Sequence, residues 1–247
     1  MDRSQYEKLI PSNYTIIRTI MDNYYSSKLA AENLRKCYDI APARTRQYLA
    51  AEIDHVLKHI SEDDIVLELG CGYGRVLSQI ASRCSFLIGI DTSYESLKMA
   101  QSYLSEYSTI ELSLMNAIDL CFPDSSFDAV ICIQNGISAF KVDSYDLVRE
   151  AYRVARPDGI CLFSTYASKF WDSRLEWFRL QSEAGLLGEI DWNLTNDGII
   201  VCRDGFTART YTEHDFKVIL EALGVRGQFI EVDESSLFCE IQVKDKP

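Results

Sequence analysis

Short apolar runs alternate along the middle of this chain with segments whose apolar residues recur at helical spacing. Each run predicts a buried strand, and each intervening segment predicts a helix or a turn. The predicted strands lie at Ile65–Leu69, Phe86–Asp91, about Ile110–Leu114, Asp128–Ile133 and Ile160–Thr165. This alternation predicts an open, largely parallel sheet covered by helices on both faces.

The pattern resumes near the end of the chain. A predicted helix from about Glu213 to Leu223 precedes two more predicted strands, Phe229–Val232 and Leu237–Val243. The final strand is a candidate for an antiparallel position. We therefore predict an α/β fold: a Rossmann-like, doubly wound, mostly parallel seven-stranded sheet with N-terminal helices and an inserted cap.

Two segments flank or interrupt the alternating pattern. Residues 1–60 have helical periodicity from Tyr14 to Tyr38, and Pro42 suits the first turn of a second helix that ends near Ile60. Residues 166–209 predict an aromatic-rich helix, followed by a hairpin that pairs 190–194 with 199–202 about an Asn-Asp-Gly turn. We predict three parts: a helical lid (1–60), a cofactor-binding core (61–165 and 210–247) and an inserted substrate cap (166–209).

Three alternate glycines follow the first predicted strand, at Gly70, Gly72 and Gly74, and a predicted helix begins directly after them. Glycines allow close approach of a ligand to the backbone, and a helix N-terminus offers free N–H groups. A dinucleotide-binding fingerprint would need a third glycine where this chain has Arg75. The pattern therefore favours a nucleotide-like ligand and weakens the alternative of a nicotinamide-dependent oxidoreductase.

The stretch Glu-Leu-Gly-Cys-Gly-Tyr-Gly at 68–74 resembles the first motif of class I S-adenosylmethionine-dependent methyltransferases. The stretches at 120–128 and 153–159 are similar to two later segments of that family. The resemblance covers about residues 64–159 in detail. It implies S-adenosyl-L-methionine as cofactor, bound across the carboxyl ends of the strands, and transfer of its methyl group to an acceptor.

The resemblance also implies a set of cofactor-binding residues. Glu68 matches an acidic residue that helps to hold the cofactor amine, and Asp91 matches one that accepts hydrogen bonds from both ribose hydroxyls. Asn116 stands where the family commonly has an aspartate that accepts a hydrogen bond from the adenine amino group. The asparagine side chain still offers an acceptor oxygen, but without the negative charge. The segment that begins at Arg44 is similar to one in related enzymes in which an arginine pairs with the cofactor carboxylate, so Arg44 is a candidate for this role. The full predicted set is Arg44, Glu68, Gly70, Cys71, Gly72, Gly74, Asp91, Thr92, Asn116, Ala117 and Gln134; Thr92 also begins a stretch that resembles a capping box with Glu95.

Charge and composition limit the class of methyl acceptor that we expect. The chain has 247 residues, 47% of them hydrophobic, and a formal net charge of −12, which disfavours a polyanionic nucleic-acid substrate. No apolar run reaches membrane-spanning length, and residues 1–8 lack the features of a signal peptide, so we expect a cytoplasmic protein without nucleic-acid or membrane partners. We predict a small-molecule methyl acceptor; the oligomeric state stays open.

Other residue types carry weaker signals. The eight cysteines include no Cys-x-x-Cys and are typical of reduced core thiols, although a metalloid or thiol methyltransferase that uses cysteines is an alternative, as is a non-catalytic cofactor-binding module. His55 and His59 lie one helical turn apart, but without a carboxylate partner they make a poor metal site, so we predict no metal. His214 is a candidate base by type only, and no catalytic residue is assigned. Tyrosines and tryptophans in the N-terminal and cap segments are candidates for an aromatic acceptor pocket.

Overall fold

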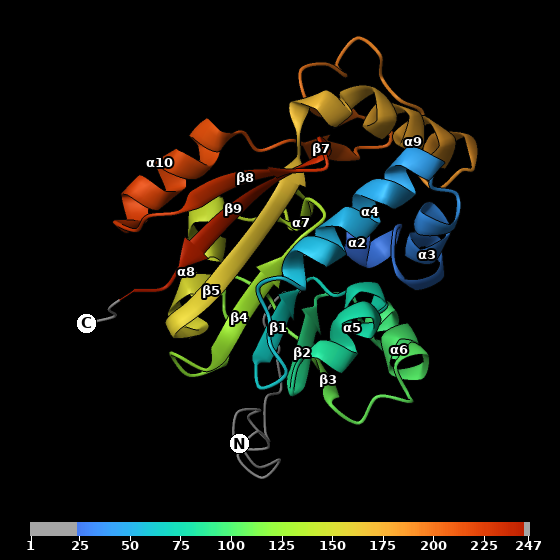
Figure 1. The fold of residues 1–247 in the computed structure, drawn as a ribbon. Helices are drawn as coiled ribbons and strands as arrows, with labels where there is room; N and C mark the ends of the chain where they lie inside the picture. Colours follow the sequence, from blue (N-terminus) through green and yellow to red (C-terminus); the bar gives the residue numbers. More distant parts are fainter. Residues whose placement is uncertain (1–23, 245–247) are drawn as a thin grey trace.

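The computed structural model describes residues 24–244 of the chain (Figure 1). Its main sheet has seven strands in the order β3-β2-β1-β4-β5-β9-β8. The strands are β1 (Ile65–Leu69), β2 (Phe86–Asp91), β3 (Ile110–Leu114), β4 (Phe127–Cys132), β5 (Ala155–Tyr166), β8 (Gln228–Val232) and β9 (Ser236–Gln242). The first five are parallel, and β9 is antiparallel to both β5 and β8. The predicted fold class and the antiparallel final strand are confirmed.

Helices cover both faces of this sheet, as the near-continuous apolar strands require. One face packs against α7 (Gly136–Ala139), α8 (Ser144–Val154) and α10 (Glu213–Leu223), through residues such as Leu147 and Phe216. The other face packs against α4 (Ala43–Val56), α5 (Arg75–Ile80) and α6 (Tyr94–Tyr103), through residues such as Val56 and Leu77. Figure 1 shows α4 crossing in front of the strands and α8 and α10 on the far side of the sheet.

A third cluster of buried apolar residues lies beyond the carboxyl ends of the strands. It joins the helices α2 (Tyr24–Ser27) and α3 (Ala31–Asp39) to α9 (Trp171–Glu183) and to the small hairpin β6–β7 (Ile199–Val201 and Thr207–Arg209). Helix α4 takes part in this cluster through Tyr48 and in the sheet core through Val56. The N-terminal helices and the cap segment therefore share one core, and the division of the chain into lid, core and cap stays a prediction.

Three local predictions are wrong. The predicted helix from Tyr14 to Tyr38 begins outside the described residues, and within them it is broken between Ser27 and Ala31, whose φ of 48° is left-handed. The predicted Asn-Asp-Gly turn does form, since Asn196 and Ile199 exchange two backbone hydrogen bonds. The main partner of β6 is nevertheless Thr207–Arg209, and residues 190–194 contribute a bridge from Ile190 to Cys202. The Phe206 side chain, which is 1% exposed and directly precedes β7, packs in the cap core, so the predicted turn forms but the main partner of β6 differs.

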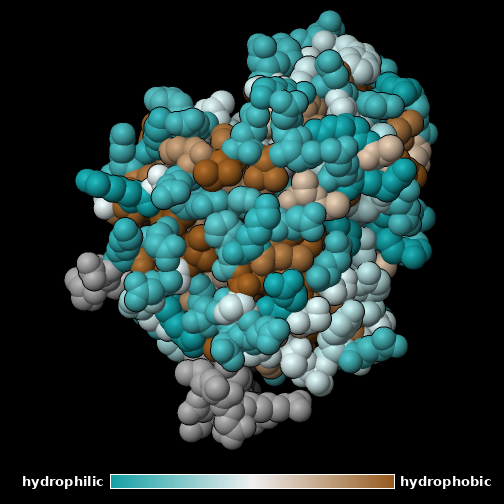
Figure 2. Space-filling view, in the orientation of Figure 1, coloured by the Kyte–Doolittle hydropathy of each residue, from teal (hydrophilic) through white to brown (hydrophobic). Residues whose placement is uncertain are grey.

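The third error concerns the start of α6. Its N-cap is Ser93, whose hydroxyl accepts a hydrogen bond from the backbone N–H of Ser96, so the predicted capping box of Thr92 and Glu95 does not form. Thr92 instead lies at the strand end and lines the pocket described below. The space-filling view shows a mainly polar surface on this side of the molecule, with hydrophobic residues exposed in patches over its middle (Figure 2). Among residues 24–244, no helix has both the length and the apolar character needed to cross a bilayer.

Candidate functional site

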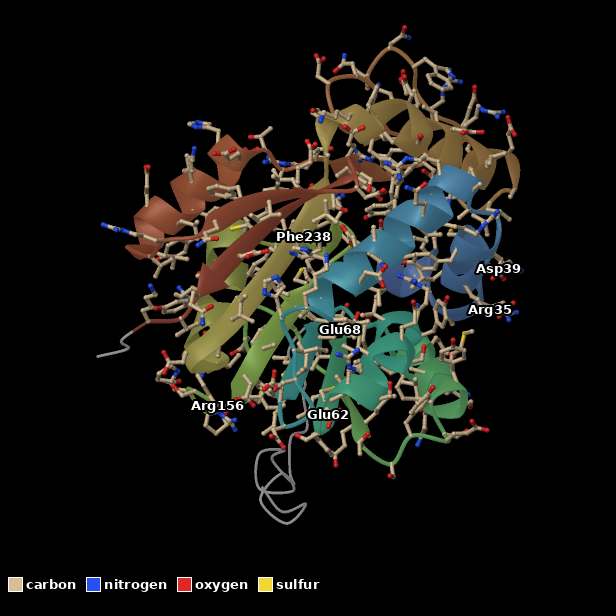
Figure 3. The ribbon with its side chains drawn as sticks, viewed as in Figure 1. Arg35, Asp39, Glu62, Glu68, Arg156 and Phe238 are labelled. Carbon is tan, nitrogen blue, oxygen red and sulfur yellow. The ribbon has the colours of Figure 1, made fainter. Side chains whose placement is uncertain are left out.

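A pocket lies at the carboxyl ends of β1, β2 and β4. Strand order reverses between β1 and β4, and a crevice at such a reversal is where open α/β sheets bind ligands. Glu68 comes from the end of β1, Asp91 from the end of β2 and Gln134 from the segment after β4. Figure 3 shows Glu68 in the middle of the molecule, away from the charged residues labelled at its surface.

The wall of the pocket divides into two parts. We call the strand ends and the glycine loop the floor, and the side chains of α2, α3 and α9 with their flanks the roof. Lining residues of the floor are Glu68, Gly70, Cys71, Gly72, Tyr73, Arg75, Val76, Asp91, Thr92, Ile133 and Gln134. Lining residues of the roof are Tyr25, Leu29, Leu34, Cys37, Tyr38, Trp177, Phe178 and Gln181.

The glycine loop needs its glycines for conformation and for space. Gly70 and Gly72 have φ values of 75° and 55°, in the left-handed region that side chains rarely adopt. A Cβ on Gly70 would lie 2.8 Å from the ring of Phe140, and one on Gly72 would lie 2.8 Å from Leu34 of the roof. A side chain at either glycine would therefore collide with its neighbours, and the loop stays open as a cradle only because these residues are glycines.

Asp91 joins the glycine loop to the start of α6. Its Oδ2 accepts a hydrogen bond from the Gly72 N–H at 2.8 Å, and its Oδ1 accepts one from the Ser93 N–H at 2.7 Å. Burial raises the pKa of this carboxyl, against the lowering effect of those N–H groups. Each carboxylate oxygen can accept a further hydrogen bond, so Asp91 is held in place and still able to receive two hydroxyl donors.

Two ionisable side chains of the floor, Glu68 and Arg75, each have a buried atom that finds no hydrogen-bond partner in the described part of the chain. Glu68 is 4% exposed, and its Oε2 has no hydrogen-bond partner. Burial raises the pKa of Glu68 to about 8, although nearby Arg75 lowers it. The guanidinium of Arg75 stacks on the ring of Tyr38 at 4.5 Å, and its buried Nη2 also has no partner. Because unpaired buried polar atoms are costly, this carboxyl and this guanidinium are suited to a ligand that carries both an amine and a carboxylate.

Gln134 adds a third unsatisfied group, its Nε2. Its backbone, at a left-handed φ of 57°, is fixed by two hydrogen bonds from its N–H, to Glu52 Oε2 at 2.8 Å and to Ser164 Oγ at 2.7 Å. Glu52 is 0% exposed on α4 and also accepts a hydrogen bond from Ser236 at 2.6 Å. Burial raises the pKa of Glu52 to about 7. Helix α4 therefore positions one wall of the pocket through a buried carboxyl.

The roof is aromatic and is held by its own contacts. The indole Nε1 of Trp177 donates a hydrogen bond to the Cys37 carbonyl at 2.8 Å, which links α9 to α3. The ring of Tyr38 lies 6.0 Å from that of Trp177 and 6.2 Å from that of Tyr73 in the floor. The Ala31 N–H donates to Ser96 Oγ of α6 at 2.9 Å. Roof and floor thus enclose one pocket from opposite sides.

Seven of the eleven predicted cofactor-binding residues line this pocket, and four lie outside its lining: Arg44, Gly74, Asn116 and Ala117. The Arg44 guanidinium pairs with the Asp233 carboxylate and donates to its backbone oxygen, both at 2.6 Å. The Asn116 side chain accepts from the Ile118 N–H at 3.2 Å. The cofactor roles of these residues stay predictions. Arg75 and Glu52 were missed, although Arg75 directly follows the glycine motif and could have been found there. Aromatic residues of the N-terminal and cap segments were predicted as candidates for an acceptor pocket, and Tyr25, Tyr38 and Trp177 line this one.

The cysteines are free thiols and mostly inaccessible. Seven of the eight are buried, and Cys121 is half-buried. Cys37 and Cys71 line the pocket, but burial raises the pKa of Cys37 to about 12 and that of Cys71 well above its usual range. Burial therefore disfavours the thiolate form, which is the nucleophilic form, of both thiols.

The sequence of this chain is similar to those of known methyltransferases. A family model described as "Methyltransferase domain" matches residues 66–159, which include the glycine loop, Asp91 and Gln134. The chain is 31% identical over 120 residues to a demethylmenaquinone methyltransferase of Bacillus licheniformis (46% of this chain, 50% of the relative). It is 29% identical over 142 residues to an arsenite methyltransferase of Aquipseudomonas alcaligenes (52% of this chain, 40% of the relative). The chain thus spans half or less of the length of these relatives.

Solved structures share the fold. The crystal structure of the N-methyltransferase NodS from Bradyrhizobium japonicum, in complex with S-adenosyl-L-homocysteine, superposes with a TM-score of 0.57. The match covers 91% of this chain and 100% of that chain, at 16% sequence identity. At this identity the likeness shows the fold alone.

Proposed function

Because this chain belongs to the class I S-adenosylmethionine-dependent methyltransferase family, we propose that it transfers the methyl group of S-adenosyl-L-methionine to a small-molecule acceptor. The observation that carries the proposal is the pocket at the strand-order reversal. Its floor joins a glycine cradle to two carboxyls and a guanidinium, and the buried Glu68 Oε2 and Arg75 Nη2 have no hydrogen-bond partner among residues 24–244.

The residues of the floor fit the parts of this cofactor. The Asp91 carboxylate suits the two ribose hydroxyls, since its oxygens keep acceptor capacity beyond the two N–H groups they bind. The Glu68 carboxyl suits the amine, and the Arg75 guanidinium suits the carboxylate. In this assignment Arg75 takes the role predicted for Arg44, whose guanidinium is already paired with Asp233.

The chain's own contribution to the reaction is binding, alignment and exclusion of water. When bound, the cofactor supplies an activated methyl on a sulfonium, so no protein nucleophile is needed. Tyr38 and Trp177 of the roof would hold the acceptor against the cradle and keep water out. The described residues offer no catalytic base with a placement that commits it to the reaction.

The lining of the pocket and the charge of the chain favour a small acceptor. The roof covers the floor with aromatic side chains from α2, α3 and α9, which suits an acceptor small enough to enter between them. The net charge of −12 acts in the same direction. A cytoplasmic location belongs to this proposal and is supported by eight free cysteines, which are typical of a reducing compartment.

A direct test uses the purified protein with labelled S-adenosyl-L-methionine and measures formation of S-adenosyl-L-homocysteine. A cell extract is divided into a small-molecule fraction and a macromolecular fraction, and each is offered as acceptor. We expect turnover with the small-molecule fraction. Turnover with the macromolecular fraction alone would overturn the acceptor class. Cofactor binding without turnover on either fraction would indicate the non-catalytic binding module instead.

A further inference from the structure

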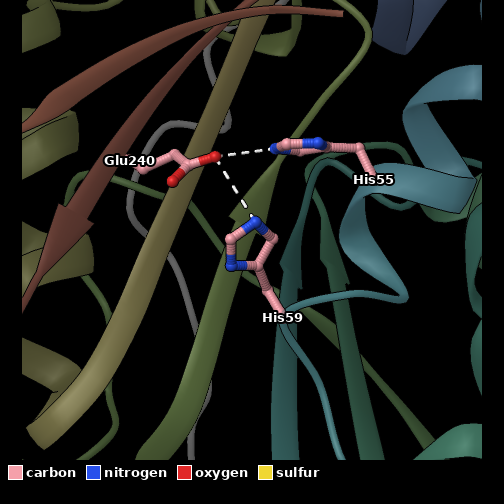
Figure 4. A group of neighbouring side chains, drawn as sticks. All are labelled: His55, His59 and Glu240. Atoms are coloured by element: carbon pink, nitrogen blue, oxygen red, sulfur yellow. Dashed lines mark hydrogen bonds and ion pairs between the residues drawn. The ribbon is translucent and has the colours of Figure 1, made fainter.

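Two histidines and a glutamate converge at the far end of helix α4 from the roof. His55 lies in the last turn of α4, His59 follows the helix, and Glu240 comes from β9. The Nε2 of His55 lies 2.7 Å from Glu240 Oε1, and the Nε2 of His59 lies 3.4 Å from the same oxygen. Figure 4 shows both imidazoles directed at this carboxylate from the α4 side. The premise that the histidine pair has no carboxylate partner is therefore wrong.

The end of α4 and the periodicity of β9 together build this cluster. His55 lies in the last turn of α4, and the turn that follows the helix brings the His59 ring to 4.9 Å from that of His55. Ser236, Phe238 and Glu240 alternate along β9 and lie on one face of the sheet. The side chain of Ser236 meets Glu52, the ring of Phe238 lies 4.2 Å from that of His55, and Glu240 meets both histidines. Because Glu240 lies far along the chain from α4, only this packing reveals the partner.

A hydrogen bond accounts for the contact between His55 and Glu240 but not for the position of His59. The 2.7 Å contact between His55 and Glu240 is a good hydrogen bond. The 3.4 Å contact from His59 to the same oxygen exceeds normal hydrogen-bond length, yet its nitrogen is also aimed at that oxygen. Three ligand atoms within 4.8 Å of one another, two of them imidazole nitrogens, are better matched to a shared cation.

The two distances from Glu240 to the histidines suit a tetrahedral metal ion after a small adjustment, and the two imidazole nitrogens lie within 4.8 Å of each other. Bonds of about 2.0–2.2 Å at tetrahedral angles place neighbouring ligand atoms about 3.4 Å apart. The His59 to Glu240 distance already has this value, and the His55 to Glu240 distance must lengthen by a fraction of an ångström. Two histidines and one carboxylate form a ligand set that zinc uses with a water as fourth ligand.

The cluster has a path to solvent and lies apart from the cofactor pocket. The His59 side chain is 25% exposed and lines a separate surface hollow with Asp64, Asp128 and Gln242. None of His55, His59 and Glu240 lines the pocket between roof and floor. A cation could therefore enter from the hollow, with a water completing its coordination on that side.

We propose that His55 Nε2, His59 Nε2 and a Glu240 carboxylate oxygen bind one divalent cation of the zinc class, which fastens the end of helix α4 to strand β9. The site is structural. It fixes the helix that also carries Glu52, whose carboxyl accepts the Gln134 N–H at the cofactor pocket. The cation takes no part in methyl transfer, so the proposal stands independently of the proposed function.

The test titrates Zn²⁺ into untagged protein against a chromophoric chelator, for wild type, His59→Gln, Glu240→Gln and His214→Gln. The chain has three histidines, and His214 is exposed in the first turn of α10, which makes it a matched control. We expect one Zn²⁺ per chain in wild type and in His214→Gln. The two ligand variants should bind at least about 10–100-fold more weakly, the loss that even an outer partner of a metal ligand causes.

A second readout separates loss of the site from loss of the fold. Zn²⁺ should raise the melting temperature of wild type and of His214→Gln, and should leave that of His59→Gln unchanged. Co²⁺ in place of Zn²⁺ should give the visible absorption of a tetrahedral centre in the first two proteins only. Equal Zn²⁺ affinity in all four proteins would assign binding to groups outside this cluster and overturn the proposal, as would no binding to wild type.

Discussion

The floor and the roof of the pocket differ in how the chain builds them. Most of the floor comes from one stretch, residues 68–92, in which a strand, a glycine loop, a helix and a second strand follow one another. The roof brings Tyr25 and Tyr38 from the start of the described chain against Trp177 from the cap. A local stretch can carry a recognisable motif, whereas a surface assembled from distant segments cannot.

The difference also separates two functional roles. The floor presents charged and hydrogen-bonding groups in fixed positions, which suits a cofactor of constant structure. The roof presents aromatic faces and few polar groups, which suits orientation of an acceptor. We therefore expect changes in the floor to alter cofactor affinity, and changes in the roof to alter turnover while cofactor affinity is kept.

The largest effect is expected from Asp91→Asn in the floor. The amide keeps an oxygen for one of the two N–H groups that Asp91 binds, but it removes the charge and one acceptor. Binding of S-adenosyl-L-homocysteine should weaken by about 1.5–3 kcal/mol, the scale of hydrogen bonds to a charged acceptor, measured by calorimetry. Glu95→Gln, which removes a charge from an exposed site on α6, is the control and should bind normally. Normal binding by Asp91→Asn would remove Asp91 from the ribose role.

A change in the roof should lower turnover and leave cofactor affinity nearly unchanged. Trp177→Leu removes a pocket wall and the hydrogen bond to the Cys37 carbonyl. Since misplacement of an acceptor can cost about 100-fold in rate, we expect turnover to fall by about 10-fold or more. The dissociation constant of S-adenosyl-L-homocysteine should change by less than about threefold, well under 1.4 kcal/mol. Trp192→Leu makes the same substitution at a site that is 57% exposed and should leave both quantities unchanged. Equal losses of affinity and turnover in Trp177→Leu would contradict the separation of roles.

Arg75 and Arg44 compete for one role, and their variants decide between them. Arg75→Met removes the guanidinium with the unsatisfied buried Nη2, and cofactor affinity should fall by about 10-fold, or about 1.4 kcal/mol. Arg44→Met breaks the pair with Asp233 and should leave affinity within about threefold of wild type, because that pair lies outside the pocket lining. The reverse result would restore the carboxylate role to Arg44. Calorimetry with S-adenosyl-L-homocysteine measures both.

The buried carboxyls should give a smaller effect, on the pH dependence of stability. The pKa values of Glu52 and Glu68 are raised to about 7 and about 8, above the 4.5 of an exposed glutamate. The folded protein therefore holds protons that the unfolded chain has lost, and the free energy of unfolding should fall as pH rises from about 5 to about 8. His55, whose pKa burial lowers, acts in the opposite sense below about pH 6.5.

Variants isolate the two carboxyls from that background. Glu52→Gln and Glu68→Gln should each flatten the decline measured by denaturant unfolding across this pH range. Glu221→Gln, at an exposed position of α10, should leave the slope unchanged. An identical slope in all of these proteins would show that the two buried carboxyls ionise normally.

The sequence predicted the floor well because its signals are local. Apolar runs marked the strands, and residues 68–74 carried the glycine pattern, so Glu68, Gly70, Gly72 and Asp91 were found. Glu52 was not found, because nothing in its helix reveals that it meets Gln134 and Ser236. The sequence analysis also assumed that His55 and His59 have no carboxylate partner. This assumption was wrong because the partner, Glu240, lies on the last strand, far from them in the sequence. The Asn-Asp-Gly turn was predicted correctly, but the main partner of β6 was not, because burial of Phe206 brings the later segment 207–209 against it.

The most direct test of the central claim is calorimetric titration of the unmodified protein with S-adenosyl-L-homocysteine and, separately, with NADH. The glycine cradle, the Asp91 carboxylate and the unsatisfied groups of Glu68 and Arg75 predict one S-adenosyl-L-homocysteine site per chain and no binding of NADH. Binding of NADH without binding of S-adenosyl-L-homocysteine would contradict the account.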